Sequence, residues 1–148
     1  MQHKFAIVYS EFNTTITQAL FQGAKTRLLE RGIDEKNIVV AKVPGAIEIP
    51  LTAQLFAQQK HFSAIICLGA VIRGDTSHYD YVCQQVSQGC QKVMLDFNLP
   101  VIFGILTTEN EAQAKARIGG SEGHKGIEAA DAALQMVEVI ERIGKISL

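Results

Sequence analysis

Four short runs of apolar residues recur along the chain, and they constrain its fold more than any other feature. They are rich in Val, Ile and Phe and occupy residues 4–9, 37–43, 63–71 and 100–106. Because these runs are nearly continuous and do not alternate with polar residues, they are typical of strands that are covered on both faces. A segment of helical length follows each run. The pattern therefore predicts a parallel sheet buried between helices.

The segments between and after these runs have the features of helices. The first keeps a helical apolar period and ends at Gly32, and a capping box of Thr108 and Glu111 is expected to open the fourth. The order β-α-β-α-β-α-β-α-α predicts one α/β domain over residues 1–148, a three-layer α/β/α sandwich with a four-stranded parallel sheet. The expected helices cover residues 15–31, 48–59, 78–96, 109–117 and 125–143.

The charge and cysteine content exclude several classes of protein. Lys and Arg number 14 against 15 Asp and Glu, so the net charge is −1 and nucleic acid is not an expected partner. No apolar run approaches the roughly 20 residues of a membrane helix, and the N-terminus lacks a convincing secretory signal, so a cytoplasmic location is expected. The three cysteines show no CxxC spacing and the histidines are scattered, so we expect neither a disulfide framework nor a metal site.

The predicted topology also indicates where a ligand should bind. In open α/β sheets, ligands bind beyond the carboxyl ends of the strands. The segments expected at that edge are "SEFNTT" (10–15), "PGAIEIP" (44–50), "RGDTSH" (73–78) and "GILTTE" (104–109). We expect these four segments to meet at one edge of the sheet, so the segment at 73–78 lies where an active site should be.

The segment "RGDTSH" carries the strongest chemical signal. His78 lies in the first turn of an expected helix and can both accept and donate a proton near neutral pH, although an ordinary surface histidine is the alternative. The Thr76 hydroxyl and the free N–H groups of the helix start suit an anion. Ser77 is expected to cap the helix, with Asp80 in a box-like position. Arg73 is expected to pair either with a phosphate or, as a structural salt bridge, with a carboxylate.

The segment "PGAIEIP" suits a ligand that approaches the backbone closely. Gly45 and Ala46 leave room for such an approach, and Glu48 is expected either to accept hydrogen bonds from a polyol or to interact with a helix dipole. The chain has no GxGxxG or P-loop pattern, so a dinucleotide or nucleoside triphosphate is not expected.

Four further residues are candidates for ligand contact. Phe12 is expected to stack on a planar ring or to anchor the core, and Phe103 to be a core residue by default. Arg117 and Lys125 are cations that a phosphate can use, or else solvated charges. Together with His78, these residues indicate acid–base chemistry on a small phosphorylated substrate, without identifying the reaction.

Five segments, in this order and at these spacings, resemble the lumazine synthase family. The resemblance implies a flavodoxin-like fold and the condensation of 5-amino-6-(D-ribitylamino)uracil with 3,4-dihydroxy-2-butanone 4-phosphate to 6,7-dimethyl-8-ribityllumazine, a step of riboflavin biosynthesis that uses no metal or organic cofactor. The segments are "EFN" (11–13), "VPGAIEIP" (43–50), "GAVIRGDTSHYDYVC" (69–83), "PVIFGILTTENEAQAKAR" (100–117) and "GHKGIEAA" (123–130).

The resemblance also implies a role for each matching residue. His78 matches the general acid/base, and Phe12 matches the aromatic residue that stacks on the pyrimidine. In the family, the residues matching Phe103 and Arg117 reach the site from a neighbouring subunit. The positions matching phosphate-binding residues are Asp75, Thr76 and Arg117. Those matching further pyrimidine- and ribityl-binding residues are Ala46, Ile47, Glu48, Ala70, Val71, Ile72, Phe103 and Lys125.

The resemblance implies small-molecule substrates and a homopentamer. It leaves open a decamer or an icosahedral 60-mer, and an association with riboflavin synthase. Ser10, Ile47 and His124 depart from the residues usual at their positions, which bears on substrate affinity. The alternatives are a catalytically weak flavin- or lumazine-binding shell protein of the same fold and an unrelated phosphosugar-processing α/β enzyme.

Overall fold

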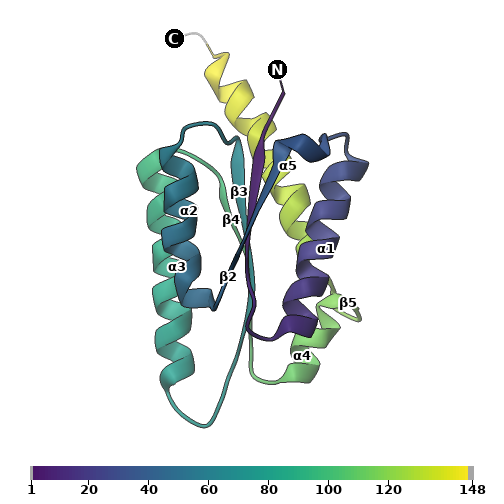
Figure 1. Ribbon diagram of the computed structural model, residues 1–148, viewed down its shortest axis with the longest axis vertical. Coiled ribbons are helices and arrows are strands. Elements are labelled where there is room, and N and C mark those ends of the chain that lie inside the picture. The colour runs from purple at the N-terminus through teal and green to yellow at the C-terminus, as the bar shows by residue number, and fades with distance from the viewer. Residues whose placement is uncertain (1, 147–148) are drawn as a thin grey trace.

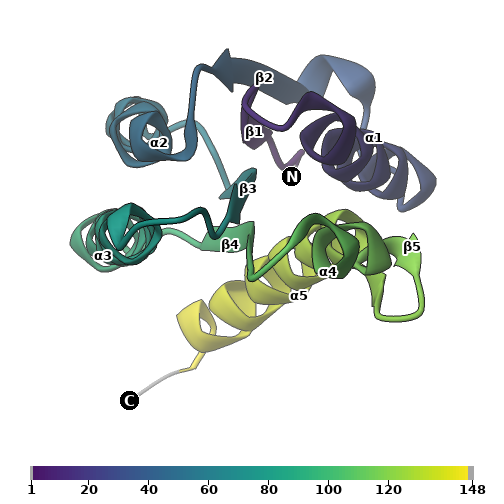
Figure 2. The ribbon, with the colours of Figure 1, turned by 90° about the horizontal axis from the view of Figure 1, so that it is seen from below.

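A four-stranded parallel sheet forms the centre of the computed structural model, which describes residues 2–146. The strands lie in the order β2-β1-β3-β4. Figures 1 and 2 show α2 and α3 on one face and α1, α4 and α5 on the other. The prediction of a three-layer α/β/α sandwich is thereby confirmed. The strands are β1 (Phe5–Ser10), β2 (Ile38–Val43), β3 (Ala64–Ile72) and β4 (Val101–Thr108).

All five expected helices are present, together with short elements that were not predicted. The helices are α1 (Thr14–Glu30), α2 (Ile49–Gln58), α3 (His78–Phe97), α4 (Glu111–Ala116) and α5 (Lys125–Gly144). The further elements are the 3-10 turns η1 (Glu35–Asn37) and η2 (Ala46–Glu48) and the strands β5 (Ile118–Gly120) and β6 (Gly123–His124). The last two pair as a small antiparallel hairpin between α4 and α5.

Each face of the sheet packs into its own apolar cluster. Phe5 and Ile7 of β1 belong to the cluster shared with α1 and α5, whereas Ala6 and Val8 belong to the one shared with α2 and α3. Successive side chains of a strand point to opposite faces. A strand covered on both faces therefore needs apolar residues at every position, which explains the continuous apolar runs. Cys67 is fully buried in β3, as expected for a small core residue.

Two glycines allow α1 and α5 to approach each other closely. A Cβ atom at Gly126 would overlap the main-chain carbonyl of Leu20, and one at Gly23 would overlap the ring of His124. Only glycine leaves room for such contacts. The start of α5 is therefore held directly against the middle of α1.

The carboxyl ends of all four strands lie at the lower end of the molecule in Figure 1, where the chain turns into α1, α3 and α4. Within residues 2–146, no helix combines the length and the apolarity needed to cross a membrane.

Candidate active site

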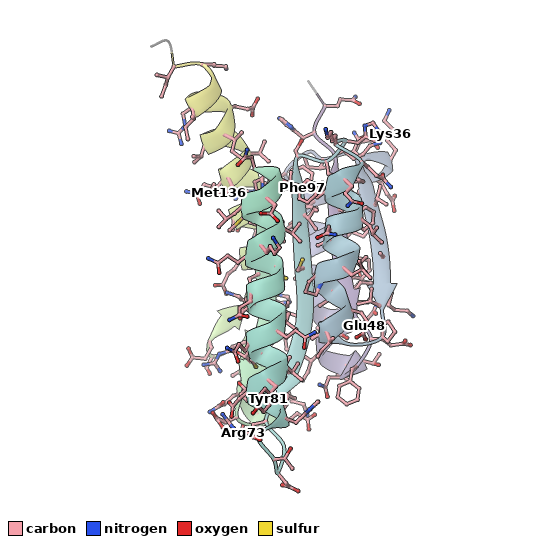
Figure 3. All side chains as sticks on the ribbon, turned by 90° about the vertical axis from the view of Figure 1, so that its left-hand side faces the viewer. Lys36, Glu48, Arg73, Tyr81, Phe97 and Met136 are labelled. Atoms are coloured by element: carbon pink, nitrogen blue, oxygen red, sulfur yellow. The ribbon has the colours of Figure 1, made fainter. Side chains whose placement is uncertain are left out.

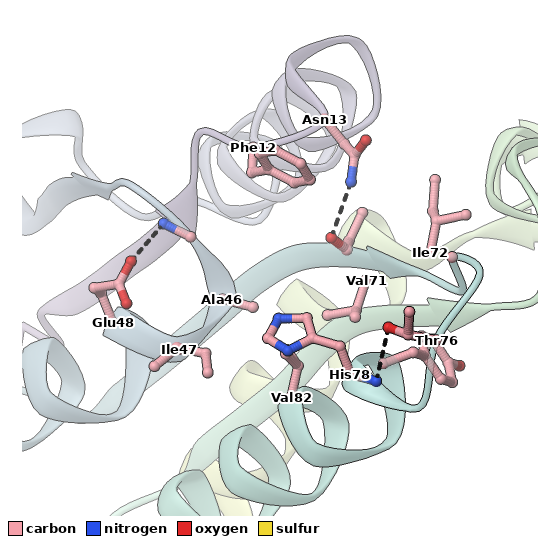
Figure 4. A pocket seen from close by; sticks show the side chains of 14 residues that line it. Phe12, Asn13, Ala46, Ile47, Glu48, Val71, Ile72, Thr76, His78 and Val82 are labelled. Carbon is pink, nitrogen blue, oxygen red and sulfur yellow. Dashed lines mark hydrogen bonds between the residues drawn. The ribbon is translucent and has the colours of Figure 1, made fainter.

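A pocket of about 340 Å³ lies at the carboxyl ends of the strands, as the topology predicts. The segments after β1, β2 and β3 contribute its lining, and Figure 4 shows their side chains around a common space. Asn13, Tyr79 and Val82 also line it, although the sequence analysis did not single them out. The predicted site residues that line it are Phe12, Ala46, Ile47, Glu48, Ala70, Val71, Ile72, Thr76 and His78.

His78 occupies the first position of α3, and its imidazole lies in this first pocket near Ala46 and Val82 (Figure 4). Its main-chain N–H donates to the Thr76 hydroxyl at 3.3 Å. The expected cap at Ser77 is wrong, because the Ser77 side chain makes no cap hydrogen bond. His78 is also exposed, so its ring can exchange protons with solvent and with a bound ligand.

Arg73 forms the structural salt bridge that was one of its two expected roles. Its guanidinium donates to Glu109 Oε2 at 2.6 Å and to Asp80 Oδ1 at 3.0 Å. It also lies over the Tyr79 ring, 4.4 Å from the centroid, a cation–π contact. Asp80 thus pairs with Arg73 and does not take part in a capping box. The start of α3 is in this way tied to the end of β4.

Tyr79 forms part of the wall of the first pocket next to His78. Burial raises the pKa of its phenol, with a hydrogen bond to Cys83 as a second cause in the same direction. The phenol therefore stays protonated at neutral pH and acts as a neutral group beside His78.

Phe12 is 71% exposed at the mouth of the first pocket. The alternative of a core anchor is therefore wrong. Next to it, Asn13 adopts a left-handed conformation with φ 66°, and its Nδ2 donates to the Ala70 carbonyl at 3.2 Å. This bond joins the end of β1 to the end of β3, so the Phe12 ring is held beside the strand ends (Figure 4). Asparagine tolerates this conformation better than most residues do.

Glu48 closes the turn that follows β2. Its Oε1 accepts a hydrogen bond from the Gly45 N–H at 2.9 Å, an interaction of an acidic group with a helix start. Within residues 2–146, its second carboxylate oxygen makes no hydrogen bond to the chain. Glu48 lines the first pocket, so that oxygen is available to a ligand hydroxyl.

A second pocket, of about 390 Å³, contains all but one of the predicted site residues that the first one lacks. Phe103, Arg117 and Lys125 line it, with Phe103 only partly buried. The four strand-end segments meet at one edge of the sheet, as expected, and main-chain hydrogen bonds join them there. Within a single chain, however, the segment after β4 lines this second pocket. Asp75 is exposed and lines neither pocket.

The second pocket combines two cations with two carboxylates. Arg117 donates from Nη1 to the Gln113 carbonyl at 2.8 Å, and the Lys125 N–H donates to the Arg117 carbonyl at 2.8 Å. Glu122 and Glu128 also line the pocket. The hairpin of β5 and β6 connects Arg117 to Lys125 and so fixes the two cations relative to each other.

Asn110 caps α4 through its Oδ1, which accepts from the Gln113 N–H at 2.8 Å. The expected capping box of Thr108 and Glu111 is wrong, because Thr108 ends β4 and its hydroxyl donates to the Asn110 carbonyl. Among residues 2–146, no group of three or more His, Cys, Asp or Glu side chains is arranged to hold a metal ion.

Comparison with known proteins gives one consistent result. The sequence model of the family described as 6,7-dimethyl-8-ribityllumazine synthase matches residues 2–141. Proteins named 6,7-dimethyl-8-ribityllumazine synthase from three strains of Coxiella burnetii are each 52% identical to this chain over 140 residues. The match covers 95% of this chain and 93% of each relative.

Proposed function

The chain belongs to the 6,7-dimethyl-8-ribityllumazine synthase family, and we propose that the two pockets described above are the two halves of its active site. It is a transferase of riboflavin biosynthesis. It condenses 5-amino-6-(D-ribitylamino)uracil with 3,4-dihydroxy-2-butanone 4-phosphate and releases 6,7-dimethyl-8-ribityllumazine, phosphate and water. We further propose that the whole chain, residues 1–148, acts as one domain.

The placement of Phe12 supports the first pocket as the pyrimidine site. Its exposed ring lies beside the strand end formed by Ala70, Val71 and Ile72, so a planar ring can stack between them. The turn at Ala46, Ile47 and Glu48 then receives the ribityl chain, with the free Glu48 carboxylate oxygen accepting from its hydroxyls.

His78 acts as the general acid/base of the reaction. The 5-amino nitrogen forms a bond to the ketone carbon, and the resulting adduct loses water to give an imine. A proton is then removed from the carbon between the imine carbon and the phosphate-bearing carbon, and the C–O bond to phosphate breaks. Ring closure expels a second water. These steps take protons from nitrogen and carbon and deliver them to leaving oxygen atoms, and an imidazole open to the pocket can take and return them.

Thr76 and Arg117 hold the phosphate, together with the loop at Asp75. Thr76 lines the first pocket together with His78, and its hydroxyl accepts from the His78 N–H at the start of α3 and can still donate to a phosphate oxygen. A leaving phosphate gains negative charge, and a fixed guanidinium stabilises that charge. Phe103 and Lys125 complete this half of the site.

A homopentamer explains why Arg117 and His78 line different pockets of one chain. An assembly can place the second pocket of one subunit against the first pocket of its neighbour. Large apolar side chains are exposed on the helices, among them Leu51 and Leu55 on α2, Leu95 on α3 and Ile143 on α5. Tyr81 on α3 and Met136 on α5 are also exposed, and Figure 3 shows both on the side of the molecule where α3 lies. Such surfaces fit contacts between subunits.

The proposals for the oligomeric assembly and for the cellular location rest on the family resemblance. We propose that the pentamer is the basic unit and that it works in the cytoplasm. The resemblance leaves open a decamer or an icosahedral 60-mer built from it, and an association with riboflavin synthase. Nucleic acid and membranes are not partners in this proposal. A catalytically weak flavin- or lumazine-binding shell protein is the second candidate, but intact His78, Thr76 and Arg117 favour the enzyme.

The deciding experiment mixes the purified protein with both substrates and follows the lumazine chromophore against the spontaneous reaction. Acceleration is expected from the wild-type chain, and the mass of the assembly is measured on the same sample by light scattering. Ligand binding without acceleration would favour the shell protein. An active monomer would contradict the proposal that a neighbour completes the site.

A further inference from the structure

We propose that His124, in its neutral form, positions Arg117 and Lys125 by capping α5, so that protonation of its ring weakens phosphate binding at the second pocket. His124 does not line that pocket, so it acts through the cations and does not touch the ligand. The proposal rests on the assignment of Arg117 and Lys125 to the phosphate half of the site.

The cap requires an unprotonated ring nitrogen. His124 is the N-cap residue of α5, with extended backbone angles of φ −136° and ψ 105°, and its Nδ1 accepts from the Ile127 N–H at 3.3 Å. A neutral imidazole accepts at one nitrogen, but an imidazolium donates at both. The protonated ring therefore loses the cap and places a positive charge at the positive end of the α5 dipole.

His124, the capping residue, is joined through the main chain to both Arg117 and Lys125. His124 pairs with Ile118 in the β5–β6 hairpin, and Ile118 directly follows Arg117. On its other side, the Lys125 N–H donates to the Arg117 carbonyl at 2.8 Å. When the start of α5 loosens, the strand pair and this bond loosen with it, and Arg117 and Lys125 lose their fixed separation.

The His124 ring has little freedom to move away from Ile127. It lies against Gly23 of α1, where a Cβ atom would overlap the ring. On the hairpin side, a Cβ atom at Gly119 would lie 3.7 Å from its Cδ2. The ring therefore lies between α1 and β5. When it is protonated, it loses the hydrogen bond from the Ile127 N–H but has no room to move to another position.

The charged groups near the His124 ring are of both signs. Arg117, Glu122 and Lys125 lie in or next to the hairpin, and Glu128 lies one turn along α5. A Cβ atom at Gly123 would lie 3.3 Å from Glu128 Oε2, which shows that Glu128 lies over the hairpin. The facing part of α1 contributes Gly23 and the main chain of Leu20, which carry no charge, and one turn further on Arg27, which pairs with Asp131 of α5 at 3.7 Å. The hydrogen bond from Ile127 thus decides which form of the ring fits the folded chain.

The test measures the binding of inorganic phosphate to the assembled protein by calorimetry, at about pH 7.5 and about pH 5.5, the range in which histidines titrate. The wild type is compared with His124→Asn, which caps without titrating, and with His124→Ala, which cannot cap. His78 is intact in all three proteins, and phosphate itself changes charge equally for all, so both effects cancel in the comparison.

We expect acidification to weaken phosphate binding about fivefold more in the wild type than in His124→Asn, the size of a lost helix cap. His124→Ala should bind about fivefold more weakly than the wild type at the higher pH, and His124→Asn should restore the affinity. Equal pH dependence of wild type and His124→Asn would overturn the proposal, as would tighter binding by the protonated wild type.

A second readout separates this proposal from the assignment of the phosphate site. Hydrogen exchange at the Ile127 amide reports the cap without any ligand. Its protection should fall on acidification in the wild type and hold in His124→Asn. Loss of that difference would overturn the role of His124. If the difference persists but none of the proteins binds phosphate, the cap stands, and the proposals that rest on phosphate at Arg117 and Lys125 are overturned.

Discussion

The Arg73 guanidinium donates to Glu109 across 2.6 Å and joins the end of β3 to the end of β4. The same side chain bonds Asp80, one turn into α3, and covers the Tyr79 ring. The carboxylate of Asp80 contributes most to raising the pKa of Arg73 above its ordinary value, and that of Glu109 adds to it. The guanidinium therefore stays charged. Both ends of the loop that carries Thr76 are thereby anchored.

Arg73→Met should lower turnover a few-fold by loosening the first turn of α3 around His78, while the substrates still bind. The ion pairs are partly exposed, so the effect on stability should be small. The measurement is steady-state kinetics beside thermal unfolding. Lys92→Met serves as the control, because it breaks an exposed ion pair with Asp96 in the same helix, and unchanged kinetics in Arg73→Met would contradict the anchoring role.

His78→Ala should lower turnover about 100-fold, because it removes the group that exchanges protons with the reacting atoms. Binding of the pyrimidine substrate and the assembly state should change little, since the side chain is exposed in the first pocket. The matched control is His61→Ala, an exposed histidine outside both pockets. Turnover equal to that of the control would remove His78 from the mechanism.

Arg117→Ala should raise the KM for the phosphate substrate about 10- to 100-fold, the range for a lost hydrogen bond to a charged group. The KM for the pyrimidine substrate should stay near its original value. Arg142→Ala, in the last turn of α5, provides a control that removes an arginine away from both pockets. Equal effects on both substrates would argue against a specific role in phosphate binding.

Gly23→Ala should destabilise the fold by about 1–3 kcal/mol, because the new methyl group overlaps the His124 ring. Inside a helix, a change from Gly to Ala usually has the opposite effect and raises the free energy of unfolding by up to about 1 kcal/mol. Denaturant unfolding measures the sign directly. Gly144→Ala is the control, since no heavy atom lies within 4 Å of a Cβ placed there, and its stability should hold or rise.

Cys83 should be the thiol that reacts in the native protein, because Cys67 and Cys90 are buried. Burial raises the pKa of Cys83, so its thiolate is scarce at neutral pH and the reaction should be slow. The rate should rise with pH as the thiolate forms. A colorimetric thiol reagent counts the reacting groups, and all 3 cysteines should react after denaturation. Fast labelling of Cys67 in the native state would contradict the packing of β3.

The four sheet strands were predictable because a parallel strand covered on both faces leaves a continuous apolar signature. The run from Phe5 to Tyr9 illustrates this, since each of its side chains is buried. The β5–β6 hairpin could not be predicted in the same way. Residues 118–124 contain glycines and polar residues without an apolar alternation, and the hairpin depends on packing against α1 and α4.

The helix caps show where local patterns fail. Thr108 and Ser77 had suitable chemistry, but Asn110 caps α4 and Thr76 accepts the bond at the start of α3. Several hydroxyl and amide side chains compete at each position, and the exact end of the preceding strand decides between them. That end is fixed by pairing across the sheet, which the local sequence does not contain.

The segments that contribute to the site were predictable, but their division between two pockets was not. The strand-end rule placed His78 and Phe12 at one edge, and the structure confirms this. The exposure of Phe12 and the separation of Arg117 from His78 depend on how α1, α4 and α5 pack, so neither follows from periodicity.

The proposed division of the active site between two pockets has a genetic consequence. A subunit with His78→Ala keeps an intact second pocket, and a subunit with Arg117→Ala keeps an intact first pocket. When the two impaired variants are co-expressed and assemble at random, about a quarter of the junctions between subunits unite the two undamaged halves. Two alleles that are each impaired alone should therefore complement each other and restore part of the lost activity.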